Sequence, residues 1–418
     1  MSNFIRNTIA FMFSLLGVVY SANALESGGI DINYDVVRAA GMGNTGAGIS
    51  MGAGSVFLNP GALSLQYDNE ILITGTGWVS YTAYRDRTPS LYSTVSKPQW
   101  NTPFGMYAVF RPNRQNRFAF GLSINSPFSI KTAWKNDWKG RAIVNNYVFN
   151  TVIIQPTLSI RVSEKVGIGL GVMYCRGGLW ADKIIPDLST PSNTESTMRI
   201  YGNGQGWGIN FGTFVRWNER FSMGINARTP INIHIQNGRV SLDALKDSRN
   251  LPPFTTFKTQ LPLPYLATVG IGYRSFRQLL VTSEISYTGW NLWDSTVIRY
   301  DSLSDKLPAN ARHVNLRNTL TFKSGVEWNM PNHLALRLGA YYSLSPVRNG
   351  FVSPEYPDAN RIGVTGGIGI RVSDNFNIEL NGKYEATGER TFTFTQEGFS
   401  GIYKMNGYSA GVSFGYRF

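Results

Sequence analysis

The chain has 418 residues, of which 16% are charged, 13% are aromatic and 44 are glycine. A soluble enzyme usually has about 25% charged residues, so this composition argues against that class. The formal charge of +13 is spread along the chain rather than gathered in a recognisable module, so we expect no nucleic-acid partner. Attraction to an anionic membrane surface or to anionic substrates fits the charge better.

Residues 1–24 have the features of a signal peptide. Arg6 supplies the positive start, an apolar run covers Ile9–Tyr20, and Ala22-Asn23-Ala24 forms a cleavage site. The run is too short to span a bilayer, and no stop-transfer pattern follows it, which disfavours a retained membrane anchor. We therefore expect an exported chain that begins at Leu25.

The next stretch, residues 25–66, is rich in glycine and does not alternate as a strand does. Seven glycines fall between Gly41 and Gly61, which is too many for a stable helix but allows close backbone packing. Asn59-Pro60-Gly61 forms a turn that ends the stretch. We interpret it as a plug, or hatch, inside a closed barrel formed by residues 67–418.

Gly41 to Gly46 also match the dinucleotide-binding pattern GxGxxG. That pattern has meaning only between a strand and a helix of a βαβ unit. No hydrophobic strand precedes Gly41, and further glycines follow where a helix should run. We therefore expect no nucleotide cofactor.

Alternation in the rest of the chain predicts an all-β, 14-stranded antiparallel transmembrane barrel. In the last segment Tyr408, Val412 and Phe414 face one way and small or polar residues face the other, as in a strand between lipid and lumen. A soluble sandwich also alternates, but it rarely keeps aromatic residues at the strand ends. The segments begin near residues 69, 103, 116, 147, 165, 206, 220, 263, 278, 316, 332, 361, 375 and 406.

Six short connections alternate with seven long ones. The short ones lie at 112–115, 163–165, 218–219, 275–277, 330–332 and 373–375, and the long ones near 83–102, 131–146, 179–205, 234–262, 291–315, 344–360 and 389–405. This pattern predicts both chain ends on the periplasmic side, with the long loops outside the cell. A barrel of this width has a lumen that strand side chains alone cannot fill, which supports the hatch.

Pro127 interrupts the third segment, FAFGLSINSPFSIKTAWKNDWKGR. Proline cannot donate to a ladder, so it predicts a bulge, a kink or a gap in the wall. The alternative is that Pro127 only ends the strand at the rim. The aromatic and basic residues after it, from Lys131 to Arg141, suit either the lipopolysaccharide surface or an amphipathic anion.

No catalytic or metal-binding pattern is visible. His234, His313 and His333 lie far apart and show no metal-ligand spacing, and no nucleophile elbow accompanies them. Cys175, the single cysteine, excludes an intramolecular disulfide and is interpreted as a small buried side chain. We expect no enzyme activity, no metal and no cofactor.

Several motifs in collinear order carry a resemblance to a known family. They are Asn59-Pro60-Gly61, the run Gly121–Arg141, Gly204-Gln205-Gly206-Trp207-Gly208, Tyr287-Thr288-Gly289-Trp290, Leu344-Ser345-Pro346-Val347 and Pro357-Asp358-Ala359-Asn360-Arg361. Over essentially the whole mature length, the chain resembles the FadL/TodX (OMPP1) family of outer-membrane transporters for long-chain fatty acids and other hydrophobic compounds. The hatch motif of that family is Asn-Pro-Ala, and Gly61 takes its third place here.

The resemblance implies external capture of a ligand, an apolar pocket and release through a lateral opening in the third strand. Asn125, Ser126, Pro127 and Phe128 stand at the place of that opening. It also implies basic residues that meet a carboxylate, in the loops after strands five and nine. The candidates are Arg176 or Lys183, together with Lys306, although lumen salt bridges or solvated loop charges explain such residues as well.

We therefore expect a passive transporter of hydrophobic or amphipathic small molecules, with fatty acids as the first candidate. It would be an integral, monomeric protein of the bacterial outer membrane, in contact with its lipid and lipopolysaccharide. The alternative is a non-transporting barrel that serves as a docking or secretion component. A transporter needs an apolar tunnel from outside to the hatch, whereas a docking barrel can be fully blocked.

Overall fold

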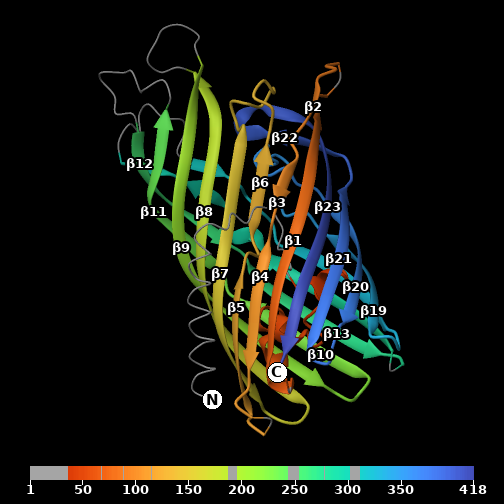
Figure 1. Cartoon of the computed structure of the whole chain (residues 1–418). Coiled ribbons are helices and arrows are strands. Elements are labelled where there is room, and N and C mark those ends of the chain that lie inside the picture. Colours follow the sequence, from red (N-terminus) through yellow and green to blue (C-terminus); the bar gives the residue numbers. More distant parts are fainter. Residues whose placement is uncertain are drawn as a thin grey trace.

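The computed structural model describes residues 36–66, 68–87, 89–113, 115–186, 195–242, 254–276, 278–301 and 311–418. The predicted signal peptide lies outside these residues. The described residues form a closed antiparallel β-barrel of 14 strands, as predicted. The barrel closes where β1 (Glu70–Arg85) pairs with β23 (Phe399–Arg417), from Glu70↔Arg417 to Arg85↔Ile402 (Figure 1).

Between β1 and β23 the wall follows the order of the chain. Its strands are β4 (Phe104–Phe110), β5 (Phe118–Asn125) continued by β6 (Ser129–Ala133), β7 (Asn146–Arg161), β8 (Val166–Pro186), β9 (Glu195–Arg216), β10 (Phe221–Arg228) continued by β11 (Ile231–Leu242), β12 (Phe254–Leu263) continued by β13 (Tyr265–Arg274), β14 (Leu279–Gly289), β18 (Thr319–Asn329), β19 (Leu334–Ser343), β20 (Arg361–Arg371) and β21 (Phe376–Thr387). Two of the breaks fall at Pro230 and Pro264, because proline has no amide to give to the ladder.

The six predicted short connections are confirmed and lie together at one end of the barrel, which we call the short-turn rim. The C-terminus lies at the same end (Figure 1). The opposite end, the long-loop rim, carries the short elements β2 (Ser93–Val95), β3 (Gln99–Asn101), η5 (Trp290–Leu292), β15 (Ser295–Val297), β16 (Arg299–Tyr300), β17 (Ala311–His313), β22 (Arg390–Phe394) and η6 (Thr395–Glu397). Among the described residues, no helix combines the length and the apolar character needed to cross a membrane.

Two of the predicted long loops are instead strands over most of their length. Residues 179–186 and 195–205 extend β8 and β9, which pair from Val166↔Val215 to Pro186↔Glu195. Residues 234–242 and 254–262 belong to β11 and β12. The prediction was wrong because the alternation inverts here: apolar residues point inward and polar residues point outward, so the pattern of a membrane strand is lost.

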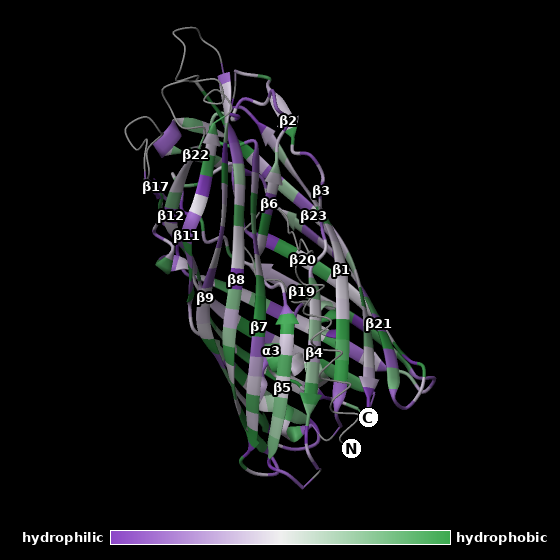
Figure 2. Ribbon diagram, turned by 60° about the vertical axis from the view of Figure 1, so that its left-hand side comes forward, coloured by the Kyte–Doolittle hydropathy of each residue, from purple (hydrophilic) through white to green (hydrophobic). Residues whose placement is uncertain are grey.

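Aromatic side chains mark the height of the apolar band on the outer wall. On β9 the exposed Trp207 lies ten residues before the exposed Trp217 (217 minus 207), and Trp207 lies against Tyr174 of β8 at 4.8 Å between ring centroids. Ten residues rise about 33 Å along a strand, or about 23 Å at a tilt of about 45°. This height matches a membrane-embedded band of about 25 Å. Figure 2 shows hydrophilic residues at the short turns that border the band.

The lumen near the short-turn rim is filled by residues 36–66, which we call the inner segment. It contains α2 (Val37–Ala40), η2 (Gly52–Gly54), α3 (Ser55–Leu58) and η3 (Pro60–Leu65). Most of its apolar side chains, including Met42, Phe57 and Leu63, are fully buried against the wall. These helices are only one or two turns long, so packing against the barrel rather than helix propensity holds their shape.

Candidate functional site

Side chains from the wall fix the inner segment in place. Glu284 on β14 accepts hydrogen bonds from the backbone amides of Gly46, at 2.9 and 3.0 Å, and of Ala47, at 2.7 Å. Glu327 on β18 accepts two from the guanidinium of Arg38, at 2.7 and 2.8 Å. Buried backbone donors require acceptors, and an ionised carboxylate is the strongest acceptor among side chains. The wall and the inner segment therefore form one hydrogen-bonded unit.

The predicted turn at Asn59, Pro60 and Gly61 joins the inner segment to itself and to the wall. The Asn59 amide donates to the carbonyls of Ala47 (2.7 Å) and Thr213 on β9 (3.1 Å). Its side-chain oxygen accepts from the amide of Gly61 (3.1 Å), and Pro60 occupies the first position of η3. A single asparagine thus caps the helix and tethers two chain segments.

Close backbone approach explains why glycine stands at residue 61. A Cβ there would lie 2.8 Å from the carbonyl oxygens of Gly167 and Gly212 in the wall. A Cβ at Gly224 would lie 1.8 Å from the carbonyl oxygen of Ala47. The inner segment is seated so near to β8, β9 and β10 that no side chain fits between them.

The strand containing Pro127 is interrupted by a bulge. Asn125, at the end of β5, pairs with Ile153 of β7. Four residues later Ser129, at the start of β6, pairs with Asn150, which is only three residues away along β7 (153 minus 150). The strand therefore carries one extra residue beside Pro127, as expected of a bulge. Of the irregularities that the sequence predicted at Pro127, the bulge is present, and the strand continues beyond Pro127 as β6.

The ladder toward the preceding strand is interrupted beside the bulge. β5 pairs with both β4 and β7, whereas β6, among the described residues, has a ladder only with β7. The last backbone hydrogen bond toward β4 runs from Ser126 N to Phe104 O (3.2 Å), and the next one toward the preceding chain segment is Lys97 N to Ala133 O (2.8 Å). We call the stretch between these two bonds the open seam. Phe128 lies beside it and is largely buried.

Above the inner segment the lumen is apolar. Inward-facing residues of β7, β8, β11 and β12, such as Phe149, Ile233, Phe257 and Leu261, form one buried cluster with aromatic residues of the loops. They border a cavity of about 110 Å³, which we call the chamber. It is lined by Ile143, Val144, Tyr147, Leu179, Ala181, Asp182, Lys183, Met198, Ile200, Leu261, Trp293, Thr296, Ile298, Tyr300, Arg312, Glu355 and Tyr356. A cavity of about this size accommodates one aromatic ring or a short piece of an alkyl chain.

Few charged groups reach the chamber. Arg312 pairs with Glu355 at 2.6 Å and donates to the hydroxyl of Ser353 at 3.2 Å, so these two charges offset each other. Lys183 lies nine residues beyond the aromatic level at Tyr174 (183 minus 174), and burial, with the nearby charge of Arg312, lowers its pKa below the ordinary value. Desolvation of an ammonium group is relieved when an anion approaches it.

The three residues that the sequence suggested for carboxylate binding lie in different places. Lys183 lines the chamber. Arg176 does not, because it is exposed on the outer side of β8, whereas its neighbour Cys175 is fully buried on the inner side. Lys306 lies outside the described residues. Cys175 is a free, buried thiol within the apolar cluster, as the sequence predicted.

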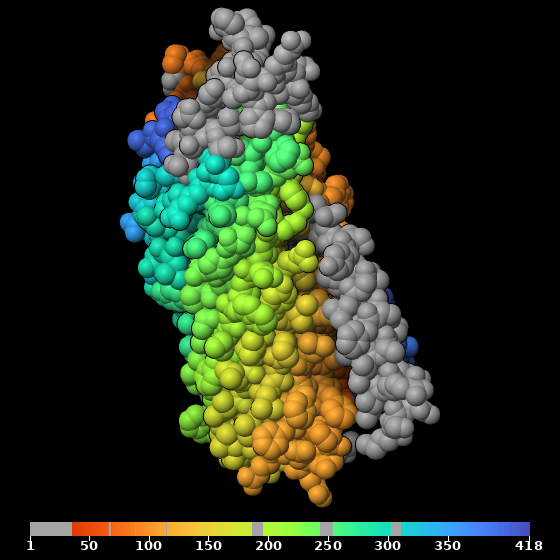
Figure 3. Space-filling view, turned by 90° about the vertical axis from the view of Figure 1, so that its left-hand side faces the viewer, coloured from red at the N-terminus to blue at the C-terminus, as the bar shows by residue number. Residues whose placement is uncertain are grey.

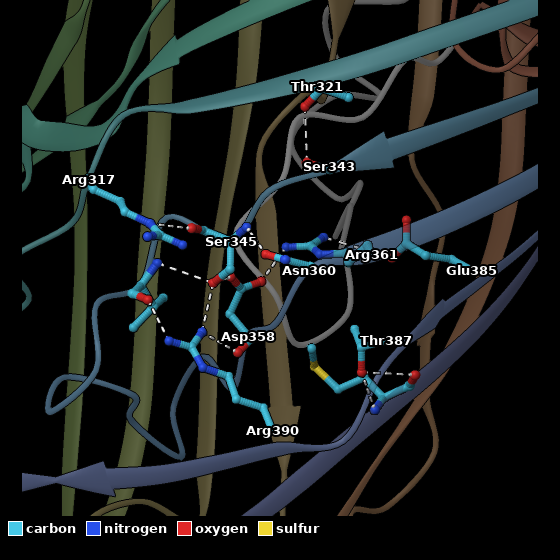
Figure 4. A network of polar contacts seen from close by, with 12 residues as sticks. Arg317, Thr321, Ser343, Ser345, Asp358, Asn360, Arg361, Glu385, Thr387 and Arg390 are labelled. Atoms are coloured by element: carbon cyan, nitrogen blue, oxygen red, sulfur yellow. Dashed lines mark hydrogen bonds and ion pairs between the residues drawn. The ribbon is translucent and has the colours of Figure 1, made fainter.

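Sequence reasoning missed a loop that folds into the barrel. Residues 352–359 are all buried, although the stretch 344–360 was predicted to face outward. Asp358, which is fully buried, accepts from Arg361 at 2.5 Å and from the hydroxyl of Ser345, and Arg390 donates to Ser345 and to the carbonyl of Val347 (Figure 4). This network turns the loop inward and brings Glu355 and Tyr356 to the chamber. In the sequence, only Pro354 and Pro357 point to this feature. They predict a rigid turn but do not tell whether the loop turns into the lumen or away from it.

Aromatic residues close the lumen toward the long-loop rim. Trp134 and Trp138 are fully buried and stacked, with 4.3 Å between ring centroids. The indole of Trp134 donates to the carbonyl of Pro354 (3.0 Å), which joins this turn to the inward loop. Lys139, next along the chain, pairs with Asp86 at 2.7 Å. The stacked pair Trp134 and Trp138 thus caps the apolar lumen, and the salt bridge between Lys139 and Asp86 lies beside it.

Comparison with known proteins places this architecture. Residues 18–418 match the family described as "Outer membrane protein transport protein (OMPP1/FadL/TodX)". The chain belongs to this family. The long-chain fatty acid transport protein of Escherichia coli O6:H1 is 21% identical over 441 residues, which cover 95% of this chain and 98% of that protein. The family resemblance inferred from the motifs is therefore confirmed.

Solved structures show the same fold. A FadL homologue of Pseudomonas aeruginosa superposes with a TM-score of 0.81 at 17% identity, covering 93% of this chain and 99% of that one. The Pseudomonas putida toluene transporter TodX superposes with a TM-score of 0.72 at 14% identity, covering 94% and 100%. This chain is accordingly an outer-membrane β-barrel of a family of transport proteins for hydrophobic compounds. Among its described residues, no three His, Cys, Asp or Glu side chains come together in a way that could hold a metal ion.

Proposed function

We propose that the protein carries amphipathic molecules with an apolar tail and an anionic head, such as long-chain fatty acids, across the outer membrane. The observation that carries this proposal is the inverted lumen, in which apolar residues line the half near the long-loop rim and enclose a chamber with Lys183 at its wall. A barrel used only for docking has no need of an apolar interior. An apolar route suits a lipid because burial of each methylene contributes about 0.8 kcal/mol, or on the order of 10 kcal/mol for sixteen carbons.

The proposed exit is lateral, through the open seam beside Asn125, Ser126, Pro127 and Phe128. The inner segment blocks the axial route, since it is buried and hydrogen-bonded to the wall. A side exit also spares the ligand a return to water, because the seam lies in the wall of a barrel embedded in lipid. The inner segment then acts as the hatch that the sequence suggested.

The route requires the long-loop rim to face outside the cell. An epitope tag inserted at Asn349 should therefore be accessible to antibody on intact cells, whereas a tag at Asn375 should become accessible only after the cells are opened. Both positions lie in connections rather than in strands, so insertion should leave the barrel intact. Labelling of the Asn375 tag on intact cells would reverse the proposed orientation.

Lys183 provides the test of the ligand class. Replacement of Lys183 by methionine keeps the length of the side chain and removes its charge, so we expect affinity for a sixteen-carbon fatty acid to fall about tenfold or more. Binding of toluene, which has no charge, should stay within twofold. The matched control is Lys165→Met at the exposed turn between β7 and β8, which should leave both ligands unaffected. Binding is measured with the purified protein in detergent by isothermal titration.

The outcomes distinguish three possibilities. Loss of fatty-acid binding alone supports the proposal. Unchanged binding of both ligands would show that the chamber does not select for a carboxylate, and the family's neutral hydrocarbons would become the better candidates. Failure of the unmodified protein to bind or retain any lipid or hydrocarbon, judged also by mass spectrometry of what copurifies, would favour the docking or secretion alternative.

A further inference from the structure

We propose that the outer face of β8, β9, β11, β12 and β16 binds the phosphate groups of lipid A, the phosphorylated glycolipid of the outer leaflet. The core of this basic face is Arg176, Arg239, Lys258 and Arg299. The inference rests on the proposed orientation of the barrel but not on the identity of the transported ligand. Figure 3 looks toward this side of the barrel, where residues of β8 to β12 run from yellow to green.

The basic face begins where the apolar band ends. Tyr174 and Trp207 mark the upper aromatic level, and on β8 Arg176 is the next outward residue beyond Tyr174. It lies opposite Gln205 of β9, which in turn lies opposite His234 of β11. Arg176, Gln205 and His234 are exposed. Side chains at this height of an outer-membrane barrel meet lipid head groups rather than acyl chains.

Further cations follow within the next few residues of the same face. Arg239 of β11 is exposed, and its guanidinium lies 3.9 Å from the ring centroid of Phe254 of β12, which orients the group flat against the wall. Stacked in this way, a guanidinium keeps its N–H edge for an oxyanion, and it binds phosphate through two parallel hydrogen bonds. A residue held by an aromatic ring is also better ordered than a free surface arginine.

Lys258 and Arg299 give independent support. They are directly opposite each other in the pairing of β12 with β16, and both are exposed. Like charges at directly opposite positions destabilise a pair of strands, because their Cβ atoms are only about 5 Å apart. Among the described residues, no carboxylate forms an ion pair with either of them. An anion that bridges the two cations removes the repulsion, so the arrangement indicates a bound anionic group.

Two acidic residues lie on or near the same face. Asp182 lies opposite Arg199 in the pairing of β8 with β9, accepts hydrogen bonds from Asn146 and also lines the chamber. Asp301 accepts from the neutral hydroxyl of Thr256, so its carboxylate offsets only part of the charge of the cations. Arg176, Arg239, Lys258 and Arg299, on β8, β11, β12 and β16, outnumber these acidic residues, so the face is basic. Strands are about 4.8 Å apart, so these cations span a width suited to a head group with two phosphates.

The decisive variant is the triple substitution Arg239→Gln, Lys258→Gln and Arg299→Gln. Its matched control changes two arginines and one lysine at the short-turn rim, namely Arg220→Gln, Arg371→Gln and Lys165→Gln, all of which are exposed. Each full-length protein is purified from outer membranes, and its folding is checked by heat-modifiable migration on gels. Binding of defined lipids in detergent is then measured by native mass spectrometry.

Three probes separate the possible sources of affinity. They are bis-phosphorylated lipid A, the same lipid with both phosphates removed, and inorganic phosphate as a competitor. We expect the triple variant to bind bis-phosphorylated lipid A about tenfold more weakly than the unmodified protein, and the control to bind it normally. Removal of the phosphates should weaken binding to the unmodified protein by a similar factor, and millimolar inorganic phosphate should not displace the lipid.

Three results would overturn the proposal. The first is equal binding of bis-phosphorylated lipid A by the triple variant and the unmodified protein. The second is equal binding of the phosphate-free lipid, which would mean that acyl chains alone carry the affinity. The third is an equal loss in the control, which would mean general charge attraction. The Lys183→Met variant should bind lipid A normally, so failure of the transport proposal would be visible separately.

Discussion

The two halves of the lumen have opposite chemistry although the same strands run through both. Near the short-turn rim, inward residues such as Glu284, Lys323 and Arg337 are polar, and they surround a hydrogen-bonded backbone segment. Near the long-loop rim, inward residues such as Phe149 and Phe257 are apolar and surround the chamber. One half holds the inner segment, and the other encloses an apolar cavity.

The outer wall makes the opposite change at the same height. Below Tyr174 and Trp207 the wall is apolar because it faces lipid, and above them it is polar because it faces head groups and water. β8 and β9 exchange their inner and outer residue types at this level while they stay in one register from Val166↔Val215 to Pro186↔Glu195. The comparison shows that the surroundings of each face (lipid, water or packed protein) decide whether its side chains are apolar or polar. Whether a face points inward or outward does not decide it.

The largest effect on the permeability of the barrel is expected from removing the inner segment. Deletion of Arg38–Leu65 should leave a barrel that still inserts but admits small polar solutes, because the remaining polar half of the lumen is wide enough for water. Liposome swelling with sugars should be faster by about tenfold or more than with the intact protein. Equal swelling rates, at equal amounts of heat-modifiable protein, would show that the apolar half alone seals the pore.

Locking the open seam should have the next largest effect. In a Cys175→Ala background, a disulfide between Thr102→Cys and Phe128→Cys would join the two sides, since each position lies two residues beyond the last bond between the strands, Ser126 N to Phe104 O. Uptake of labelled fatty acid should fall about tenfold while external binding persists, and a reductant should restore it. The matched control is a disulfide between Ala108→Cys and Leu122→Cys, which are paired below the break. Normal uptake through the locked seam would refute the lateral exit.

A single tether of the plug offers a smaller effect. Glu284→Gln keeps the shape of the side chain but replaces one of the two oxygens that accept from the amides of Gly46 and Ala47 with an NH2 donor. Leaving a buried donor without an acceptor costs about 1–3 kcal/mol, so hydrogen exchange at these two amides should accelerate by about tenfold. Glu164→Gln, at an exposed turn, is the control. Unchanged protection would mean that packing alone holds the segment.

The smallest effect concerns the cap over the apolar half. Burial alone would raise the pKa of Asp86, but hydrogen bonds from Lys139, Tyr84 and Ser90 outweigh it and hold the pKa below its ordinary value. A lowered folded-state pKa gives stability that is present above the unfolded value of about 3.9 and is lost as the pH falls through the folded value.

The fluorescence of Trp138 in this cap should therefore not change between pH 8 and pH 5. It should shift only when the pH falls below the ordinary range of a carboxyl group, because the pKa of Asp86 is lowered. Asp86→Asn should produce a similar but modest shift at neutral pH. A transition near pH 6 in the unmodified protein would point to another group.

Local sequence patterns predict much of this architecture. The alternation at Tyr408, Val412 and Phe414 predicts a lipid-facing strand, because side chains that contact lipid must be apolar. The breaks between such strands predict the short turns. Pro127 predicts the bulge, because a missing amide disrupts any ladder. Asn59, Pro60 and Gly61 predict the turn that ends the inner segment.

Only the tertiary structure decided what lies inside the barrel. The sequence predicted a loop at residues 179–205, because their apolar side chains point inward and the pattern of a membrane strand is lost. The inward direction depends on neighbouring strands that are distant in sequence. Asp358 turns the loop 352–359 into the lumen through Arg361 and Ser345. Lys183 lines the chamber while Arg176 is exposed on the outer wall, although both belong to β8, because the packed neighbours decide which side chains border the cavity. Sequence pattern specifies a strand, but closure of the barrel decides which of its faces lines the lumen.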